Sequence, residues 1–253
     1  MESKVAKVIT VCFKPRLSHG VAFGPGRLRK DRNELATSQS ALDMFKFILE
    51  KEKIIDSGLS MDTIIVNNNF DYTIGNDYLA SMDGTTTKNG VFKVIQRENV
   101  GLSFGGFNAA FQKYKNEYEY WLFSEDDLYY SKDGYAKGYL DILNENYNCA
   151  FVATIGIGRP NHETKHAHGG QGFTHRKYME ETIELEFNLD DGTNKQACKT
   201  AGSLAYYDDR NAFNHRLHCI CGEVPFTYSL VRLGYDICVD ENPEEWYRSY
   251  DEK

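Results

Sequence analysis

Short apolar runs alternate with helical patterns over most of the chain, and this alternation constrains the fold more than any other feature. The runs are rich in β-branched and aromatic residues, which favour strands. Those that we interpret as strands are residues 5–13, 62–66, 92–96, 120–124 and 149–158. Between them, apolar residues recur at helical spacings, as at Leu42, Phe45 and Leu49, and Thr37, Ser38 and Ser40 are candidate N-caps for that helix. This order predicts an α/β protein, an αβα sandwich around a mostly parallel sheet.

The last third of the chain is less regular. Residues 159–176 carry several Gly and His residues and predict a long loop, residues 181–189 predict an edge strand, and residues 222–234 predict a helix. The run GYDICV, residues 234–239, predicts a final strand. Because no linker and no internal repeat stand out, we expect one domain over residues 1–253.

The charge balance argues against nucleic acid as a partner. The formal net charge is −8. A protein that binds a phosphate backbone normally carries a basic face, and the clearest basic run here is the short RLRKDR at residues 27–32. We therefore expect no nucleic-acid partner.

The cysteines and the hydropathy pattern predict a reduced protein of the cytoplasm. Six cysteines are scattered along the chain without C-x-x-C spacing, which argues against a structural zinc site. Disulfide frameworks belong to small secreted chains, and this chain is not small. No run of 18 apolar residues occurs and MESKVAKVITV has no long apolar stretch, so we expect neither a membrane span nor a signal peptide.

Three adjacent acids follow an apolar strand. The run YWLFS, residues 120–124, has no charge, and Glu125, Asp126 and Asp127 come directly after it. In open α/β sheets, ligands bind at the carboxyl ends of the strands, where three neighbouring carboxylates would repel one another. A divalent cation removes this repulsion, and Mg²⁺ typically uses one or two carboxylates plus substrate phosphates. The triplet therefore indicates a site for a metal ion with a diphosphate; the alternative is an acidic turn exposed to solvent.

The stretch around these acids resembles the central signature of GT-A-fold nucleotide-sugar glycosyltransferases, especially the inverting family 2. Asn99 and Gly101 match its Asn-x-Gly element, and the acid triplet stands, as E-D-D, where the family carries its D-x-D-like acids. The small residues that match the intervening helix are Gly105, Gly106, Ala109 and Ala110. The specific resemblance covers residues 97–127, within a coarser one over about residues 5–240. It implies a GT-A-like (Rossmann-like) fold.

The resemblance also implies a metal-assisted transfer of a sugar to an acceptor hydroxyl, with inversion. Asp127 and Glu125 would hold Mn²⁺ or Mg²⁺. Glu223, in the segment GEVPF, stands where the family carries its catalytic base, and Val224 replaces the Asp that usually follows. The nucleotide-binding half would be about residues 1–130, and the acceptor-binding half about residues 131–253.

The substrates implied by the resemblance are a nucleotide-sugar donor, UDP- or GDP-linked, and a carbohydrate or glycan acceptor. The first strand, the second strand and the 97–127 signature would bind the donor. The residues expected to contact it are Phe13, Pro15, Arg16, Asn67, Asn68, Asn99, Gly101, Glu125 and Asp126. Asn side chains can hydrogen-bond a base edge or a ribose, and they are also common in turns.

Two other function classes fit the same residues. A sugar nucleotidyltransferase also uses carboxylates and Mg²⁺ on an α/β sheet, and GPGRLRK at residues 24–30 faintly matches its Gly-rich basic loop. A non-catalytic carbohydrate-binding protein on the same fold would bind sugar without metal-dependent turnover.

The segment between residues 162 and 176 is rich in Gly and His and admits three interpretations. The candidate zinc ligands are His162, His166 and His168, with His215 and His218 as further candidates; no nearby Cys supports them. The glycines Gly169, Gly170 and Gly172 would let an acceptor sugar approach the backbone, in a flexible loop beside the acids that orders on binding. The third interpretation is a surface loop with incidental histidines.

Overall fold

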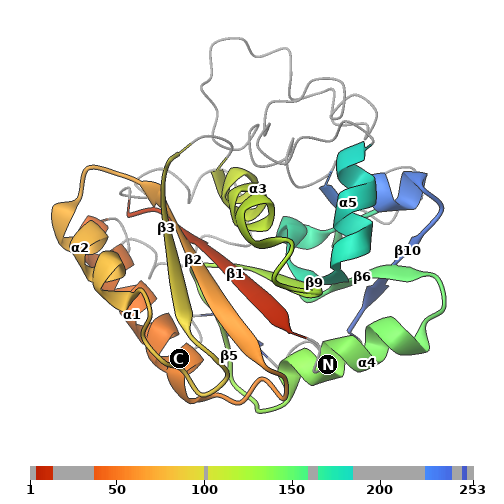
Figure 1. The fold of residues 1–253 in the computed structure, drawn as a ribbon, viewed down its shortest axis with the longest axis horizontal. Helices are drawn as coiled ribbons and strands as arrows, with labels where there is room; N and C mark the ends of the chain where they lie inside the picture. The colour runs from red at the N-terminus through yellow and green to blue at the C-terminus, as the bar shows by residue number, and fades with distance from the viewer. Residues whose placement is uncertain are drawn as a thin grey trace, which may run out of the picture.

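The computed structural model describes residues 4–13, 37–99, 102–158, 165–184, 226–240 and 247–249. Its centre is a seven-stranded sheet of order β10-β6-β9-β4-β1-β2-β3 (Figure 1). The strands of this sheet are β1 (Val5–Val11), β2 (Met61–Asn69), β3 (Phe92–Glu98), β4 (Tyr120–Glu125), β6 (Cys149–Ala153), β9 (Gly172–His175) and β10 (Asp236–Val239). Neighbouring strands are parallel except where β9 pairs with β4 and with β6.

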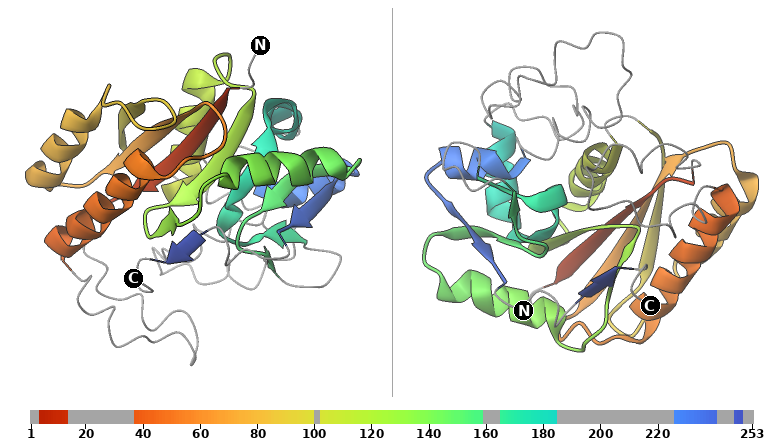
Figure 2. Two further views of the ribbon diagram at one scale, coloured as in Figure 1. Left: turned by 90° about the horizontal axis from the view of Figure 1, so that it is seen from below. Right: turned by 180° about the vertical axis from the view of Figure 1, so that it is seen from behind.

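Helices cover both faces of the sheet (Figure 2). One face carries α1 (Ser38–Ile54), α2 (Thr73–Met82) and α4 (Tyr135–Glu145). The other face carries α3 (Leu102–Tyr114), α5 (Arg176–Glu184) and the helical residues 226–232. The predicted αβα sandwich around a mostly parallel sheet is confirmed.

Small elements complete the described chain. A two-stranded antiparallel sheet pairs β5 (Leu128–Tyr130) with β11 (Tyr247–Ser249). A second one pairs β7 (Ile157–Gly158) with β8 (His166–Ala167), and the 3-10 helix η4 (His168–Gly170) follows it. None of the helices in the described ranges has the length and apolar character needed to cross a bilayer.

The central strand β1 shows why the sheet forms. Ala6 and Val8 pack into the core on the α3 face, whereas Val5 and Ile9 pack into the cores on the opposite face. A parallel strand buried on both faces has a near-continuous apolar sequence. Lys7 interrupts this sequence, and its side chain is nevertheless fully buried.

The buried Lys7 is paired with the buried Glu52 of α1 in an ion pair. Its Nζ also lies 4.3 Å from the ring centroid of Tyr130 and 5.5 Å from that of Tyr135. Burial lowers the pKa of Lys7, and the carboxylate of Glu52 opposes this shift. The predicted cap of α1 is confirmed at Thr37, which forms a capping box with Ser40.

Two sequence expectations about the last third are wrong. Residues 172–175, expected to lie in a long loop, form β9 between β4 and β6. Phe173 and Thr174 are fully buried there, and the Thr174 hydroxyl donates to the Ala150 carbonyl (2.6 Å), so a strand this short is stabilised by its two neighbours. Residues 181–184, expected to begin an edge strand, are the end of α5.

The expectation that all cysteines are reduced is also wrong for one pair. Cys149 of β6 and Cys238 of β10 form a disulfide. The two strands are parallel neighbours, which brings the Cα atoms to 5.9 Å, within the usual range for a disulfide. The sequence separation of 89 residues concealed this proximity.

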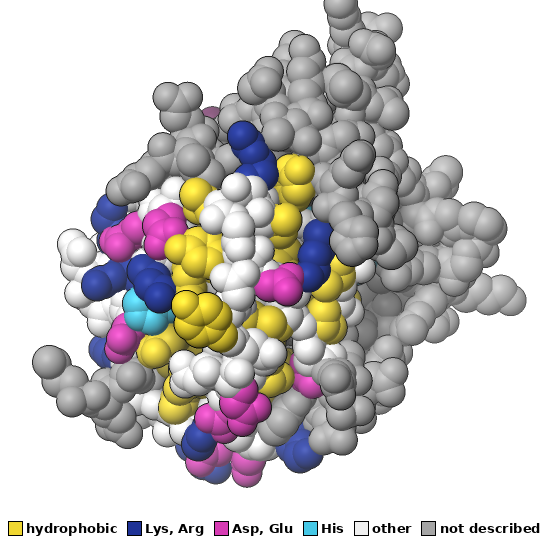
Figure 3. All heavy atoms as spheres, turned by 90° about the vertical axis from the view of Figure 1, so that its right-hand side faces the viewer, with side chains coloured by type: hydrophobic (Ala, Val, Ile, Leu, Met, Phe, Trp, Pro, Cys, Tyr) yellow, Lys and Arg dark blue, Asp and Glu magenta, His cyan; other side chains and the backbone are white. Residues whose placement is uncertain are grey.

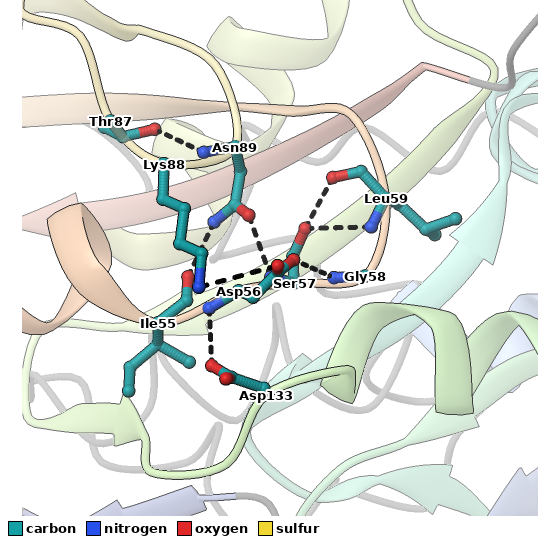
Figure 4. Close-up of polar contacts among 9 residues, drawn as sticks. All are labelled: Ile55, Asp56, Ser57, Gly58, Leu59, Thr87, Lys88, Asn89 and Asp133. Carbon is teal, nitrogen blue, oxygen red and sulfur yellow. Dashed lines mark hydrogen bonds and ion pairs between the residues drawn. The ribbon is translucent and has the colours of Figure 1, made fainter.

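A network of turns closes the amino-terminal edge of the sheet (Figure 4). The Asn89 side chain accepts from the Ser57 backbone N–H (2.8 Å) and donates to the Ile55 carbonyl (2.9 Å). Asp133 accepts from the Asp56 backbone N–H (2.8 Å). These bonds join the end of α1, the loop before β3 and the start of α4. This edge is therefore occupied by structural contacts.

Asp62 of β2 forms a second polar cluster near the same edge. It accepts from Tyr118 (2.6 Å) and from the Val91 backbone N–H (3.0 Å), and it pairs with Lys4 (3.0 Å). Burial alone would raise the pKa of Asp62, but the hydrogen bonds and Lys4 outweigh it, so the pKa lies below its usual value. Burial, together with the bond to Asp62, raises the pKa of Tyr118.

We expect Asp62→Asn to lower the free energy of unfolding at pH 7 by about 1–3 kcal/mol, as for a lost hydrogen-bonded charge. Because the folded pKa is below the unfolded value of about 3.9, the carboxylate stabilises the fold above that value and stops doing so as pH falls through the folded pKa. Urea unfolding at pH 7 and pH 3 measures this. An equal loss of unfolding free energy at pH 7 and at pH 3 would contradict the stabilising role of the Asp62 carboxylate.

Candidate active site

Four parallel strands end at one edge of the sheet, opposite the turn network. Thr10 of β1 pairs with Glu125 of β4, Val11 of β1 pairs with Asn67 of β2, and Asn67 pairs with Gln96 of β3. Adjacent strands lie about 4.8 Å apart. The register therefore places the acids after β4 and the amides of β2 and β3 in one row across the carboxyl edge, where α/β sheets bind ligands.

The acid triplet lies at the end of this row. Glu125 is the last residue of β4, and Asp126 and Asp127 form the turn into β5. The Asp126 side chain is buried, whereas Glu125 and Asp127 are half-buried. Phe123 packs into the hydrophobic core on the α3 face of the sheet. Glu125, two residues later on the strand, therefore lies on the α3 face as well. The acids thus follow a buried strand, as the sequence indicates.

Two expected donor-binding amides show defined contacts. The Asn68 side chain is buried and accepts from Arg97 Nη1 (2.7 Å). Asn99 Nδ2 donates to Cys12 Sγ (3.7 Å), and Asn99 Oδ1 is buried without a hydrogen-bond partner. Arg97 and Cys12 are residues that sequence reasoning missed. Arg97 could have been found by aligning β2 and β3 as parallel neighbours, because the register pairs it with Asn68.

Phe13 is the described residue of the expected nucleotide-binding loop after β1. Its side chain is buried, and its ring lies 6.4 Å from the ring of Phe45 and 6.0 Å from the ring of Tyr72. Phe13 is therefore a core residue at the carboxyl edge. Several expected site residues lie outside the described residues: Pro15, Arg16, Gly101, His162, His215, His218 and Glu223.

The described part of the Gly- and His-rich segment is packed into the fold. Gly169 and Gly170 have positive φ angles of 65° and 62°. Gly170 is buried, and a Cβ built there would overlap the Phe104 ring and lie 3.1 Å from Phe226 Cδ1. This part of the segment therefore packs against α3 and the helical residues 226–232, and Gly172 pairs with Phe123 near the acids; ordering of the segment on ligand binding stays a prediction. Within the described ranges, no three His, Cys, Asp or Glu residues are placed to hold a metal ion, so the zinc hypothesis for His166 and His168 gains no support.

The segment then runs away from the acids. His175 pairs with Tyr120 at the amino end of β4, and the Arg176 backbone N–H donates to the Glu119 carbonyl (2.8 Å). Burial lowers the pKa of His175, and its hydrogen bond with Glu119 (3.3 Å) opposes the shift. On the side that carries α5 and β10, acidic and basic side chains intersperse around hydrophobic ones (Figure 3).

The helical residues 226–232 approach the candidate site from the α3 face. The Phe226 ring lies 5.4 Å from the ring of Phe123 and 6.0 Å from the ring of Phe104. The backbone N–H of Ala167 donates to the Thr227 hydroxyl (2.8 Å). These contacts place the start of this helix against the carboxyl-terminal half of β4.

No protein-family model and no curated protein matches the sequence. Among solved structures, the chain is similar to the crystal structure of S. aureus TarS 1-349, with a TM-score of 0.49 and 12% sequence identity. The similarity covers 97% of this chain and 60% of the TarS chain. No functional conclusion rests on a likeness this distant.

The packing of Gly170 generates a prediction about stability. We expect Gly170→Ala to lower the free energy of unfolding by about 1–3 kcal/mol more than Gly84→Ala does. Gly84 also has a positive φ, of 76°, but nothing lies within 4 Å of a Cβ built there, so the control isolates the backbone cost. Thermal and urea unfolding measure both variants. Equal losses would show that the space at Gly170 is not tightly filled.

Proposed function

We propose that this chain is a glycosyltransferase that moves a sugar from a nucleotide-sugar donor to an acceptor hydroxyl, with metal assistance and inversion. The observation that carries this proposal is the row of side chains at the carboxyl edge of the sheet. There the acid triplet after β4 shares the edge with the amides of β2 and the end of β1. This placement supports the resemblance carried by residues 97–127, which predicts a donor site at those positions.

The acids fit a hard divalent cation. Carboxylate oxygens are ligands that Mg²⁺ and Mn²⁺ favour, and two carboxylates suffice when substrate phosphates complete the coordination. In our proposal Asp127 and Glu125 hold the ion. When bound, it neutralises negative charge that develops on the leaving diphosphate.

The remaining steps belong to the chain's own residues. Asn67, Asn68 and Asn99 bind and orient the nucleotide, which holds the anomeric carbon before the acceptor. The carboxylate of Glu223 accepts the proton of the acceptor hydroxyl as its oxygen attacks, and the nucleoside diphosphate leaves from the opposite side, which inverts the anomeric carbon. Phe226, three residues after Glu223 in the sequence, packs against Phe123 of β4, which supports a base near the acids.

A thermal-shift screen of UDP- and GDP-sugars, with and without Mn²⁺, tests donor binding, because a ligand of the folded state raises its apparent stability. Product analysis then separates the alternatives. A released nucleoside diphosphate identifies glycosyl transfer, whereas released inorganic diphosphate identifies nucleotidyl transfer. Sugar binding without metal-dependent turnover identifies a non-catalytic binding protein.

We expect turnover to require Mn²⁺ or Mg²⁺, and Asp127→Asn to abolish it while the melting temperature stays close to that of the wild type. Asp141→Asn is the matched control, because Asp141 is an exposed carboxylate on α4 that pairs with Lys137 (2.8 Å). Activity assays with added metal or excess chelator measure the effect. Full activity in chelator would refute the metal role.

We expect Glu223→Gln to lower kcat by at least about a hundredfold, as for the loss of a general base. Donor affinity should change little, because this carboxylate acts on the acceptor. Steady-state kinetics and donor titration separate the two quantities. Near-normal turnover of this variant would place the base at another residue.

A further inference from the structure

The chain leaves the sheet at the acid triplet and crosses to the face that carries α1 and α4. Glu125 ends β4 on the α3 face, whereas Tyr129 and Tyr130 of β5 pack into the cores on the opposite face. Among the described strands, β5 pairs with β11 and not with β4. Asp126 and Asp127 therefore link two strands that are held separately, and the anchoring of β5 decides where these two acids lie.

Tyr130 anchors β5 through a stack of two rings. Its ring lies parallel to that of Tyr135, the first residue of α4, with 3.7 Å between the centroids and 4° between the planes. Rings so close and so parallel overlap face to face, an arrangement that their quadrupoles disfavour relative to offset or edge-to-face pairs. A further attractive interaction therefore helps to hold this stack together.

Lys7 supplies that interaction. Its Nζ lies 4.3 Å from the ring centroid of Tyr130 and 5.5 Å from that of Tyr135, and a cation within about 6 Å of an aromatic ring is attracted to its electron-rich face. All three side chains are buried, and the attraction is strongest where water is excluded. Lys7 thus fixes the ring that stands three residues beyond Asp127.

Glu52 in turn keeps the charge on Lys7. Burial lowers the pKa of Lys7 because it favours the neutral amine, and the paired carboxylate of Glu52 opposes this shift. The other carboxylate oxygen of Glu52 accepts from the Thr63 hydroxyl (3.4 Å). Apolar residues can often replace a buried ion pair without loss of stability, so stability alone does not account for two charges in the middle of this core.

We propose that Lys7, Glu52 and Tyr130 are positioning residues for the metal site. They hold Asp127 beside Glu125 before the ion binds, and they do not touch the ion themselves. The inference rests on the proposed function, and within it on the metal role of these two acids. Ligands that are already held in place need little ordering when they coordinate. Removal of the buried charges should therefore weaken metal binding more than it weakens the fold.

Manganese titration of the full chain, followed by the electron paramagnetic resonance signal of free Mn²⁺, tests this proposal. The titrations are made with Mn²⁺ alone and with UDP or GDP added. The charge-free variant combines Lys7→Met with Glu52→Leu, and we expect it to bind Mn²⁺ about 10- to 100-fold more weakly, as for the loss of groups that orient metal ligands. Its melting temperature should stay close to that of the wild type, because neither charge is left unpaired.

Substitutions at Tyr130 test the ring itself. Tyr130→Leu removes the ring and should weaken Mn²⁺ binding to a similar extent, whereas Tyr130→Phe keeps the ring and should bind like the wild type. This comparison decides the question if the charge-free variant does not fold. Asp62→Asn is the matched control: Asp62 pairs with Ala6 near the start of β1, so this variant loses stability at the other edge of the sheet and should keep its Mn²⁺ affinity.

The outcomes separate this inference from the proposed function. If Asp127→Asn abolishes Mn²⁺ binding but the charge-free variant or Tyr130→Leu binds as tightly as the wild type, the positioning role is overturned and the glycosyltransferase proposal stands. An equal loss of affinity in Asp62→Asn assigns the effect to stability and also overturns the positioning role. If the wild type binds no Mn²⁺ in any titration, the metal site and this inference both fail, and release of a nucleoside diphosphate still tests the transfer reaction.

Discussion

The buried ion pair between Lys7 and Glu52 is the contact on which the arrangement of this fold depends most. Every residue of β1 is buried, and a lone charge there would be very costly. The pair lets α1 pack on β1 only in the register that brings Glu52 to Lys7. Removal of one partner from a buried pair leaves an uncompensated charge, whereas apolar replacement of both is often tolerated. The pair therefore specifies position more than it adds stability.

This pair also reaches the candidate site. Tyr130, whose ring lies over Lys7, stacks on Tyr135 with 3.7 Å between ring centroids. Tyr130 is three residues beyond Asp127, at the end of β5, and Tyr135 opens α4. The turn that carries Asp126 and Asp127 is thus held between β4 on one side and an aromatic anchor on the other. A preorganised acidic turn suits a metal site, because the ligands need little ordering when the ion binds.

The parallel half of the fold was predictable from sequence because each element carries its own local signal. The strands around Ile9, Ile64 and Phe123 are apolar on both faces, and α1 has a regular apolar stripe with a cap at Thr37. Helix α2 was missed, since its buried residues are few, Gly75 and Leu79 among the ten residues of the helix. A helix that contacts the core at so few points leaves little periodicity to detect.

The candidate site was predictable only where residues are neighbours in sequence. The acids after β4 form one run, and the structure places them where the run indicates. The hydrogen-bonded amides of Asn67, Asn76 and Gln96 come from three elements. They can be recognised as one set only once the register of β2 and β3 is known. Strand β9 was missed for a similar reason: glycines and histidines flank a two-residue buried centre, Phe173 and Thr174, that its neighbours stabilise.

The position of β9 has a consequence for how the chain assembles. In the described sheet, β9 is the strand that joins β1–β4 to β6 and β10, because β4 and β6 each pair with it and not with each other. When β6 has been synthesised, its partner strand β9 still lies about twenty residues further along the chain. One edge of β6 therefore stays unpaired until β9 forms. Strands β1 to β4 can pair as each crossover forms, whereas β6 and β10 can join the sheet only after β9 has inserted beside β4. Such long-range pairing slows folding and leaves strand edges exposed in the meantime, so the nascent chain is most vulnerable to aggregation between the completion of β4 and the arrival of β9.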